Sequence, residues 1–449
     1  MKYKFLVLVL ISLNCFAQNN SYPTEKVDAI INRIQLPTIP SFKIEVTKLG
    51  AKGDSISNAK PAFDKAMALC KKNNGGTIVV PKGIYTLNGP IHFVSNVNLL
   101  LEKGAKIRFN DNPKQYLPMV LTSWEGTMLY NYSPLIYAYN CSNISITGEG
   151  TIDGNGDKIW DSFKDKEEPG KMLTREMNHT NVPLVDRKFG EGHFLRPQLI
   201  QFFNCKNILV ENVRIENAPF WCVHLLKSES ITIRGLKYKA LNHNNDGIDP
   251  EYSKDVLIEN ITFENGDDNI AIKSGRDHEG RANFQTPSEN IVIRNCSFKG
   301  LHGVVLGSEM SAGIQNVFIE NCKTRGYLKR GIYFKTNADR GGFIKDIYVR
   351  NLQLDEVEDA LYITANYHNE GSQFPSEISN IHFWNVACNK ASETGIVIQG
   401  YPQKKVRNIF LDNILVKSAK NGMTVTNSEN VTINEVVIGQ KASTPTSIK

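Results

Sequence analysis

The sequence predicts an all-β solenoid, in which short parallel strands stack coil upon coil behind an N-terminal capping helix. A phrase made of a small polar residue and an alternating apolar run recurs along the chain, with copies beginning at Asn207, Ser230, Asp255, Asn290, Asn316, Asp346, Asn380, Asn408 and Asn430. Successive copies start 22 to 35 residues apart, which is typical of solenoid repeats. Stacked coils place equivalent residues about 4.8 Å apart. Residues of neighbouring repeats are therefore expected to form rows along one face.

Composition is that of an ordinary globular chain, with 449 residues, 41% hydrophobic and 22% charged. Because each coil of a solenoid packs only on its neighbours, we predict one long domain over residues 49–438. The net charge of +6 falls to +4 without Lys2 and Lys4, a mild excess that suits an acidic partner. No basic low-complexity run or RNA-binding signature appears, so nucleic acid is not an expected partner.

The first 17 residues have the pattern of a secretory signal peptide. Lys2 and Lys4 precede an apolar stretch over residues 5–13, and Cys15-Phe16-Ala17 resembles a cleavage site. A lipid-modified Cys15 is a less favoured alternative, since Leu13 stands two rather than three residues before it. No other apolar stretch is long enough for a membrane span. We therefore predict a secreted or periplasmic protein, with a leader over residues 18–48 and a loose tail over residues 439–449.

A helix is predicted over residues 58–72, the only segment for which we expect one. Its apolar residues fall at helical spacing, and Asn74-Gly75-Gly76 follows as a stop signal. The open end of a solenoid exposes unpaired strand groups. This helix is expected to cover the first coil.

Seven cysteines remain after the signal peptide. The number is odd and no two stand at metal-ligand spacing. We expect buried small hydrophobic residues stacked along the solenoid interior; a disulfide framework is the less favoured alternative.

Two charged insertions interrupt the repeats. Residues 157–197 could form a solvated loop or the wall of a substrate cleft, and the sequence does not separate these alternatives. Residues 274–288 follow an aspartate pair directly and contain Arg276. This position favours a functional role for the second insertion.

Three carboxylates define the candidate site. Aligning the coils on their strands places the tripeptides Asp246-Gly247-Ile248, Asp268-Asn269-Ile270, His302-Gly303-Val304 and Arg330-Gly331-Ile332 in one register. Asp267 lies beside this row, and Lys335 follows five residues after Arg330. Aspartates also cap turns between strands, which is the structural alternative for any one of them. Carboxylates held so close cannot all ionise freely, so at least one pKa should rise, as acid–base hydrolysis of a glycosidic bond requires.

The same residues resemble the four motifs of the polygalacturonases, glycoside hydrolase family 28. Asn244-Asn245-Asp246-Gly247, Gly266-Asp267-Asp268, His302-Gly303 and Ile332-Tyr333-Phe334-Lys335 are similar to the family forms Asn-Thr-Asp, Gly-Asp-Asp, Gly-His-Gly and Arg-Ile-Lys. The stretches over residues 272–277 and 307–310 resemble bacterial exo-acting members most. The resemblance implies a right-handed parallel β-helix and an inverting hydrolysis of α-linked galacturonic acid without metal or cofactor.

The resemblance also implies roles for individual residues. Asp267 corresponds to the general acid, and Asp246 and Asp268 to the pair that activates water. His302 corresponds to a residue that supports protonation of the acid, and Lys335 to one that binds a substrate carboxylate. Tyr367 is similar in position to a subsite tyrosine; Asn244 and Arg276 are further candidates for substrate binding.

Tyr333 is the departure from the family pattern that bears on specificity. It stands where the family has an arginine, whereas Asn245 and Leu301 replace residues without a chemical role. An arginine would contact a uronate on the leaving-group side, while a tyrosine offers a ring and one hydroxyl. The sugar there is therefore either galacturonate or a neutral sugar such as rhamnose. Arg330 is either a partial substitute for the missing arginine or a plain surface residue.

The prediction is a pectin-degrading glycoside hydrolase, exo-acting and monomeric, whose partner is an acidic polysaccharide or oligosaccharide. Two alternatives share the solenoid. A pectate lyase needs calcium and a basic residue, so insensitivity to EDTA and absence of an unsaturated product would distinguish it. A non-catalytic polysaccharide-binding β-helix would bind polymer without turnover.

Overall fold

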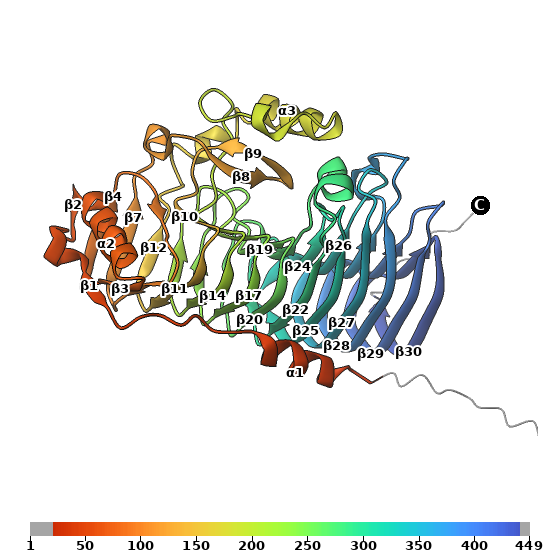
Figure 1. Ribbon diagram of the computed structural model, residues 1–449. Coiled ribbons are helices and arrows are strands. Elements are labelled where there is room, and N and C mark those ends of the chain that lie inside the picture. Colours follow the sequence, from red (N-terminus) through yellow and green to blue (C-terminus); the bar gives the residue numbers. More distant parts are fainter. Residues whose placement is uncertain (1–20, 441–449) are drawn as a thin grey trace, which may run out of the picture.

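The chain folds into an elongated parallel β-helix, in agreement with the predicted fold class (Figure 1). The computed structural model describes residues 21–440. The predicted signal peptide (residues 1–17) and residues 441–449 of the predicted tail lie outside the described residues. Residues 439 and 440 belong to the last strand. Within residues 21–440 no helix is long and apolar enough to cross a membrane.

Three parallel sheets run along the solenoid. Sheet 1 contains β1 (Lys43–Glu45), β3 (Gly76–Val80), β6 (Val97–Leu101), β11 (Ser142–Gly148), β14 (Lys206–Glu211), β17 (Glu229–Arg234), β20 (Lys254–Glu259), β22 (Ser288–Arg294) and β25 (Ile314–Thr324). Sheet 2 contains β5 (Ile91–His92), β10 (Ile136–Tyr139), β13 (Ile200–Phe203), β16 (Val223–Leu226), β19 (Ile248–Glu251), β21 (Asp268–Ile272), β24 (His302–Gly307) and β26 (Tyr327–Lys335). Sheet 3 contains β2 (Asp54–Asn58), β4 (Gly83–Leu87), β7 (Ala105–Phe109), β12 (Thr151–Asp153), β15 (Arg214–Glu216) and β18 (Lys237–Lys239). The short β23 (Ser297–Phe298) pairs with the end of β25.

The last coils are made of long strands that continue from one face to the next. These are β27 (Phe343–Thr364), β28 (Glu377–Gln399), β29 (Val406–Thr426) and β30 (Ser428–Gln440), paired in parallel in this order. β1, within the predicted leader, pairs with β3, so strand pairing begins before residue 49.

The repeated asparagines mark one turn of each coil. Asn207, Asn290, Asn316 and the equivalent residues of later coils all have a positive φ, which asparagine tolerates better than most residues. Their side chains also pair from coil to coil: the amide of Asn207 donates to Asn143 at 3.0 Å, and that of Asn430 donates to Asn408 at 3.1 Å. The sequence repeat therefore reflects a backbone requirement and a side-chain ladder at the same position.

Residues 21–440 contain three α-helices, two more than predicted. The predicted one, α2 (Lys60–Lys72), covers the N-terminal end of the solenoid (Figure 1) and buries Phe63 and Met67 in the core. α1 (Thr24–Arg33) lies in the predicted leader and packs Val27 and Ile30 against the outside of sheet 1. Its apolar residues stand at helical spacing, so the signal was present in the sequence.

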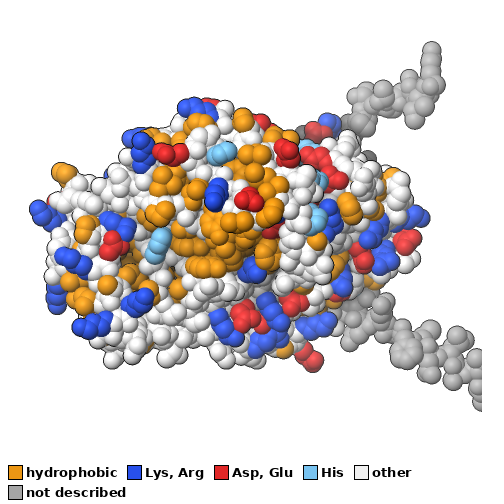
Figure 2. Space-filling model, turned by 45° about the horizontal axis from the view of Figure 1, so that its top comes forward, with side chains coloured by type: hydrophobic (Ala, Val, Ile, Leu, Met, Phe, Trp, Pro, Cys, Tyr) orange, Lys and Arg blue, Asp and Glu red, His pale blue; other side chains and the backbone are white. Residues whose placement is uncertain are grey.

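The third helix, α3 (Glu168–His179), lies in the insertion over residues 157–197. It sits with the antiparallel hairpin of β8 (Val120–Trp124) and β9 (Thr127–Asn131) above sheet 2 (Figure 1). Figure 2 brings this side forward and shows acidic and basic side chains close together around a group of hydrophobic ones. Short helical turns complete the described elements: Val46–Leu49, Pro113–Tyr116, Asp161–Phe163, Leu184–Asp186, Glu279–Asn283 and Tyr367–Asn369.

The core is a continuous apolar column inside the coils. Inward-facing residues of successive strands, such as Ile208, Ile231, Val256 and Ile291, are fully buried in one cluster. All seven cysteines within residues 21–440 are buried and unpaired, as predicted. The column holds the strands in one register and so fixes the outward-facing rows of sheet 2.

Candidate active site

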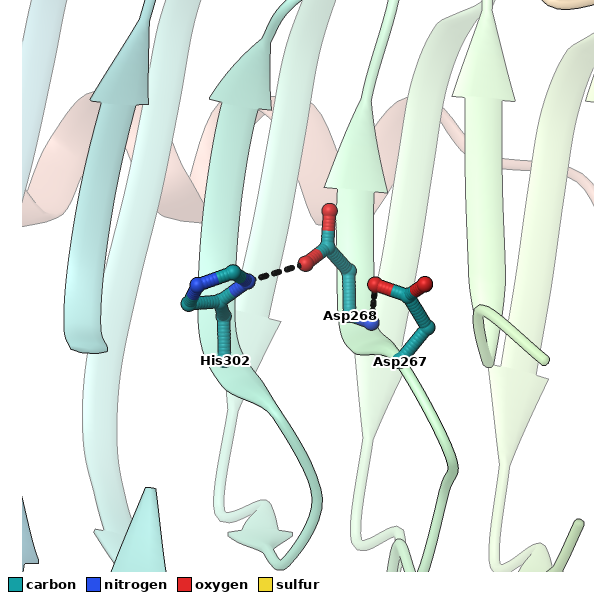
Figure 3. A group of neighbouring side chains, drawn as sticks. All are labelled: Asp267, Asp268 and His302. Atoms are coloured by element: carbon teal, nitrogen blue, oxygen red, sulfur yellow. Dashed lines mark hydrogen bonds and ion pairs between the residues drawn. The ribbon is translucent and has the colours of Figure 1, made fainter. Parts of the chain in front are cut away.

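The strand register brings the predicted row together on sheet 2. Ile248 pairs with Ile270, Asp268 pairs with His302, and His302 pairs with Arg330. This is the register expected from the sequence. Asp267 and Asp268 stand at the start of β21, and His302 stands at the start of β24, one coil further on (Figure 3).

Asp268 is the most tightly held carboxylate of the group. Nδ1 of His302 lies 2.6 Å from its Oδ1, and Nζ of Lys335 donates to its Oδ2 at 3.0 Å. The side chain is 2% exposed, so both contacts lie away from water. Such charge-assisted bonds are stronger in a buried site than on the surface. His302 thus contacts Asp268, and its support for protonation of Asp267 stays a prediction.

The pKa values of the adjacent Asp267 and Asp268 are shifted in opposite directions. Burial and the neighbouring Asp268 raise the pKa of Asp267 to about 6. Burial would also raise the pKa of Asp268, but Lys335 and His302 outweigh it and hold this pKa well below its usual range. The main-chain N–H of Asp268 donates to Oδ1 of Asp267 at 3.0 Å (Figure 3). One neutral acid and one ionised carboxylate side by side is the arrangement that acid–base hydrolysis uses.

Asn244 positions the outer oxygen of Asp267. Its amide lies 3.4 Å from Oδ2 of Asp267, and its own carbonyl oxygen accepts a bond from Nη2 of Arg196 at 2.7 Å. Arg196 is fully buried and paired with Glu167 at 3.2 Å. The insertion that carries both residues therefore supports Asn244 from behind.

A pocket of about 310 Å³ opens above these residues. Its floor is formed by Asp246, Asp267, Asp268, His302 and Lys335 together with other residues of sheet 2. Its walls come from four segments outside the regular coils: Glu125 of the β8–β9 turn, Lys171 and Arg175 of α3, Arg276 of the second insertion, and Tyr367, His368 and Glu370 of the segment after β27. Both insertions therefore form walls of the cleft.

The walls are fastened to one another by buried hydrogen bonds. The amide of Asn178 on α3 donates to the main-chain oxygen of Arg276 at 2.9 Å, and its carbonyl oxygen accepts from the N–H of Glu279 at 3.0 Å. Arg187 and Glu279 form an ion pair whose side chains are only 2% and 3% exposed. This packing joins the two insertions into one barrier beside the floor.

Three charged residues without a predicted role stand at the site: Lys273 and Glu309 line the pocket, and Asp249 is fully buried beside them. Nζ of Lys273 lies 3.3 Å from Glu309, 3.6 Å from Asp249 and 3.7 Å from Asp246. Arg276, a predicted binding residue, also lies 3.4 Å from Glu309. Strand alternation could have indicated Asp249 and Lys273, because both stand at outward positions of sheet 2 in coils already assigned to the site.

Tyr333 and Arg330 do not line the pocket, unlike the other predicted residues. Tyr333 is 5% exposed and packs against the ring of His302 at 5.2 Å and that of Tyr367 at 6.4 Å. Arg330 lies over the Tyr333 ring and forms ion pairs with Asp359 at 3.2 Å and Glu358 at 3.5 Å. Tyr367, against which Tyr333 packs, lines the pocket, so a contact of Tyr333 with the leaving-group sugar stays a prediction, as does a substitute role for Arg330.

Donor atoms of Asp267, Asp268 and His302 lie within 4.8 Å of one another, close enough to surround a divalent cation. The Lys335 ammonium already neutralises Asp268, and His302 uses Nδ1 in its bond to the same carboxylate. Positive charge at this cluster is thus supplied by the chain itself.

Comparison with known proteins assigns the chain to a family. The model of the glycosyl hydrolases family 28 matches residues 187–442. The chain belongs to this family. A second model, rhamnogalacturonase A/epimerase, pectate lyase-like, matches residues 43–105. The family 28 chain is a glycoside hydrolase built on a parallel β-helix.

The proteins similar to this chain include polygalacturonases and a solved exopolygalacturonase. A probable polygalacturonase of Vitis vinifera is 29% identical over 389 residues, which cover 82% of this chain and 73% of the relative. An exo-poly-alpha-D-galacturonosidase of Dickeya chrysanthemi is 28% identical over 72% of this chain and 57% of its own. The crystal structure of an exopolygalacturonase from Thermotoga maritima superposes with a TM-score of 0.85 at 34% identity, covering 92% of this chain and 96% of that one.

Proposed function

We propose that this family 28 hydrolase removes terminal α-galacturonosyl units from galacturonan or rhamnogalacturonan-type oligosaccharides by inverting acid–base hydrolysis. The observation that carries the proposal is the pair Asp267 and Asp268, one with a raised and one with a lowered pKa, on the floor of one pocket. The similarity to the Thermotoga maritima exopolygalacturonase supports the substrate class.

In the proposed reaction Asp267 donates its proton to the glycosidic oxygen as the bond to the anomeric carbon breaks. Asp246 and Asp268 hold a water on the opposite face of the sugar. The water oxygen bonds to the anomeric carbon, and one proton of the water passes to the ionised carboxylate of Asp268. Configuration at that carbon inverts in a single displacement. His302 and Lys335 keep Asp268 ionised and aligned.

The charge of the walls suits a uronic acid. Arg175 and Lys171 stand at the pocket on α3, with side chains 25% and 20% exposed, so a bound carboxylate can reach them. Arg175 is only loosely paired, with 3.6 Å to Glu125. Arginine and lysine recognise carboxylates through charge-assisted hydrogen bonds.

Exo action is supported by the barrier formed by the two insertions. An endo-acting enzyme needs a groove open at both ends, whereas here α3 and the second insertion are joined beside the floor through Asn178 and Glu279. A substrate is then expected to enter with one chain end first.

We also propose that the enzyme is exported through its N-terminal segment and acts as a monomer. Size-exclusion chromatography with light scattering would show a single chain mass, and a stable larger species would contradict this.

The test is a side-by-side digestion of oligogalacturonides and rhamnogalacturonan I oligosaccharides, with products resolved by size over time. Galacturonic acid released one unit at a time would support an exo-galacturonidase. Cleavage confined to the rhamnose-containing substrate would place rhamnose on the leaving-group side. An unsaturated product that disappears with EDTA would overturn the proposal in favour of a lyase.

A further inference from the structure

A buried charge network continues from the catalytic floor along sheet 2. Lys273 follows the last residue of β21, is 3% exposed, and contacts three carboxylates within 3.7 Å: Glu309, Asp249 and Asp246. Its ammonium group also lies 4.5 Å from the centre of the Trp221 ring. A single cation therefore serves three acids inside the protein.

The strand register explains why these groups meet. Lys273 forms a parallel bridge with Glu251, so it stands beside the end of β19. Asp249 is an outward residue of the same strand, and Asp246 precedes that strand by two positions. Glu309 follows β24, in the next coil, by two positions. The arrangement follows from the outward rows of three neighbouring coils.

The three acids differ in how much they depend on Lys273. Glu309 also accepts a bond from the hydroxyl of Ser308 at 2.8 Å and lies 3.4 Å from Arg276. Neither oxygen of Asp249 receives a hydrogen bond from residues 21–440. Within residues 21–440, the one ion pair of Asp246 is its 3.7 Å contact with Lys273. Lys273 is therefore the cation on which Asp246 and Asp249 depend.

Other charged and titratable groups around Asp246 mostly oppose its ionisation. The acidic groups and the thiol that face Asp246 or its partners are Cys222, Asp249, Glu251, Asp267, Asp268 and Glu309. The basic groups and histidines there are His224, His302, Lys335 and Arg276. Burial, Asp249 and Asp267 raise the pKa of Asp246 well above its ordinary value, and Lys273 offsets part of this rise. Without Lys273, Asp246 would hold its proton more tightly.

We propose that Lys273 is a positioning residue for the hydrolysis: its ammonium group orients the Asp246 carboxylate toward the pocket and stabilises its ionised form when it binds the attacking water. The inference rests on the proposed function, because it assigns Asp246 to the water-activating pair. Direct recognition of a substrate carboxylate by Lys273 is disfavoured by the three acids and the indole ring that already surround the ammonium group.

The test compares Lys273→Met, Lys273→Arg and Asp249→Asn with the wild-type enzyme, using purified full-length protein and a defined oligogalacturonide. Methionine keeps the length of the side chain and removes its charge. We expect kcat of Lys273→Met to fall roughly 100-fold with KM changed less than about 3-fold. The acidic limb of its pH profile should move to higher pH, since Asp246 then ionises later. Lys273→Arg should recover part of kcat.

Asp249→Asn gives an independent readout, because it keeps Lys273 and removes one competing negative charge. The acidic limb should then move to lower pH, and this variant remains informative if Lys273→Met does not fold. A raised KM with unchanged kcat in Lys273→Met would overturn the inference and make Lys273 a substrate ligand. Unmoved pH limbs in both variants would overturn it in favour of a purely structural lysine. Failure of the wild-type enzyme to hydrolyse any of the substrates would instead reject the proposed function.

Discussion

The Lys335 ammonium group lies 3.0 Å from the carboxylate of Asp268, although the two residues stand two coils apart along the β-helix. Together with His302 it keeps Asp268 ionised, and burial together with the resulting negative charge raises the pKa of the adjacent Asp267 to about 6. Two neighbouring aspartates thereby acquire opposite protonation states near pH 5. A difference set by environment alone is what a general acid and its partner base require.

Replacement of the proposed acid tests the assignment directly. Asp267→Asn removes the transferable proton and leaves the shape of the side chain unchanged, so we expect kcat to fall about 100-fold to 10,000-fold. Hydrolysis rates on an oligogalacturonide and a circular dichroism spectrum would be measured together. Asp64→Asn, at an exposed position on α2, is the matched control and should retain wild-type activity. Near-normal turnover in Asp267→Asn would reject it as the acid.

The pH dependence of the activity follows from the raised pKa of Asp267 and the lowered pKa of Asp268. Asp267 must be protonated, so activity should decline as pH rises through about 6. Asp268 must be ionised, and its lowered pKa keeps it so throughout the weakly acidic range. We expect a bell-shaped profile of kcat/KM with its alkaline limb near pH 6. A profile that still rises between pH 6 and 8 would contradict a neutral Asp267.

Stability should respond to the same carboxyl group. The folded-state pKa of Asp267, about 6, is above the ordinary value of 3.8. The contribution of Asp267 to the stability of the folded state is therefore fully present below pH 3.8 and is lost as pH rises through 6. Relative to wild type, Asp267→Asn should gain stability above pH 6, by at most about 3 kcal/mol. Urea unfolding at pH 4 and pH 7 would measure this; an equal difference at both values would show that Asp267 is not perturbed by folding.

Tyr333 is expected to affect the stability of the protein as well as the choice of leaving-group sugar. Its ring is covered by Arg330 at 4.7 Å and lies 5.7 Å from Lys335, so Tyr333→Arg introduces a third positive charge between two others. We expect a loss of about 1–3 kcal/mol in stability and a shift of the rate ratio toward oligogalacturonides over rhamnogalacturonan I oligosaccharides. Tyr333→Phe, which keeps the ring, should change neither. An unchanged ratio in Tyr333→Arg would show that this position does not select the leaving-group sugar.

The floor of the site was predictable because the repeat converts sequence spacing into spatial rows. The register of Asp268, His302 and Arg330 follows from the β-branched runs alone and is the one observed. The contacts of Lys273 were not predictable in the same way, since its partners Asp246 and Glu309 lie at strand ends, where turn length decides the direction of a side chain.

The walls were less predictable, because packing between distant segments determines their shape. α3 contains Pro169 and Gly170 and only scattered apolar residues, so its sequence does not favour a helix strongly. Asn178 near its end is fully buried and bonded to the second insertion, 98 residues further along the chain. Arg330 likewise forms ion pairs with Asp359 and Glu358 of the next coil, which the sequence did not predict.

The proposed exo action depends on the barrier beside the floor, and Asn178 makes the hydrogen bonds that hold this barrier together. Its amide donates to Thr127 at 2.8 Å and to the main chain of Arg276, and its carbonyl oxygen accepts from Glu279. Asn178→Ala leaves these buried groups unpaired, which should loosen the contact between α3 and the second insertion. We expect dimers and trimers among the early products of a galacturonate hexamer, where the wild-type enzyme releases monomer. Asp165→Ala, at an exposed position of the same insertion, is the control and should give monomer only. If Asn178→Ala lowers stability yet still releases only monomer, the barrier between the insertions is not what limits the enzyme to chain ends.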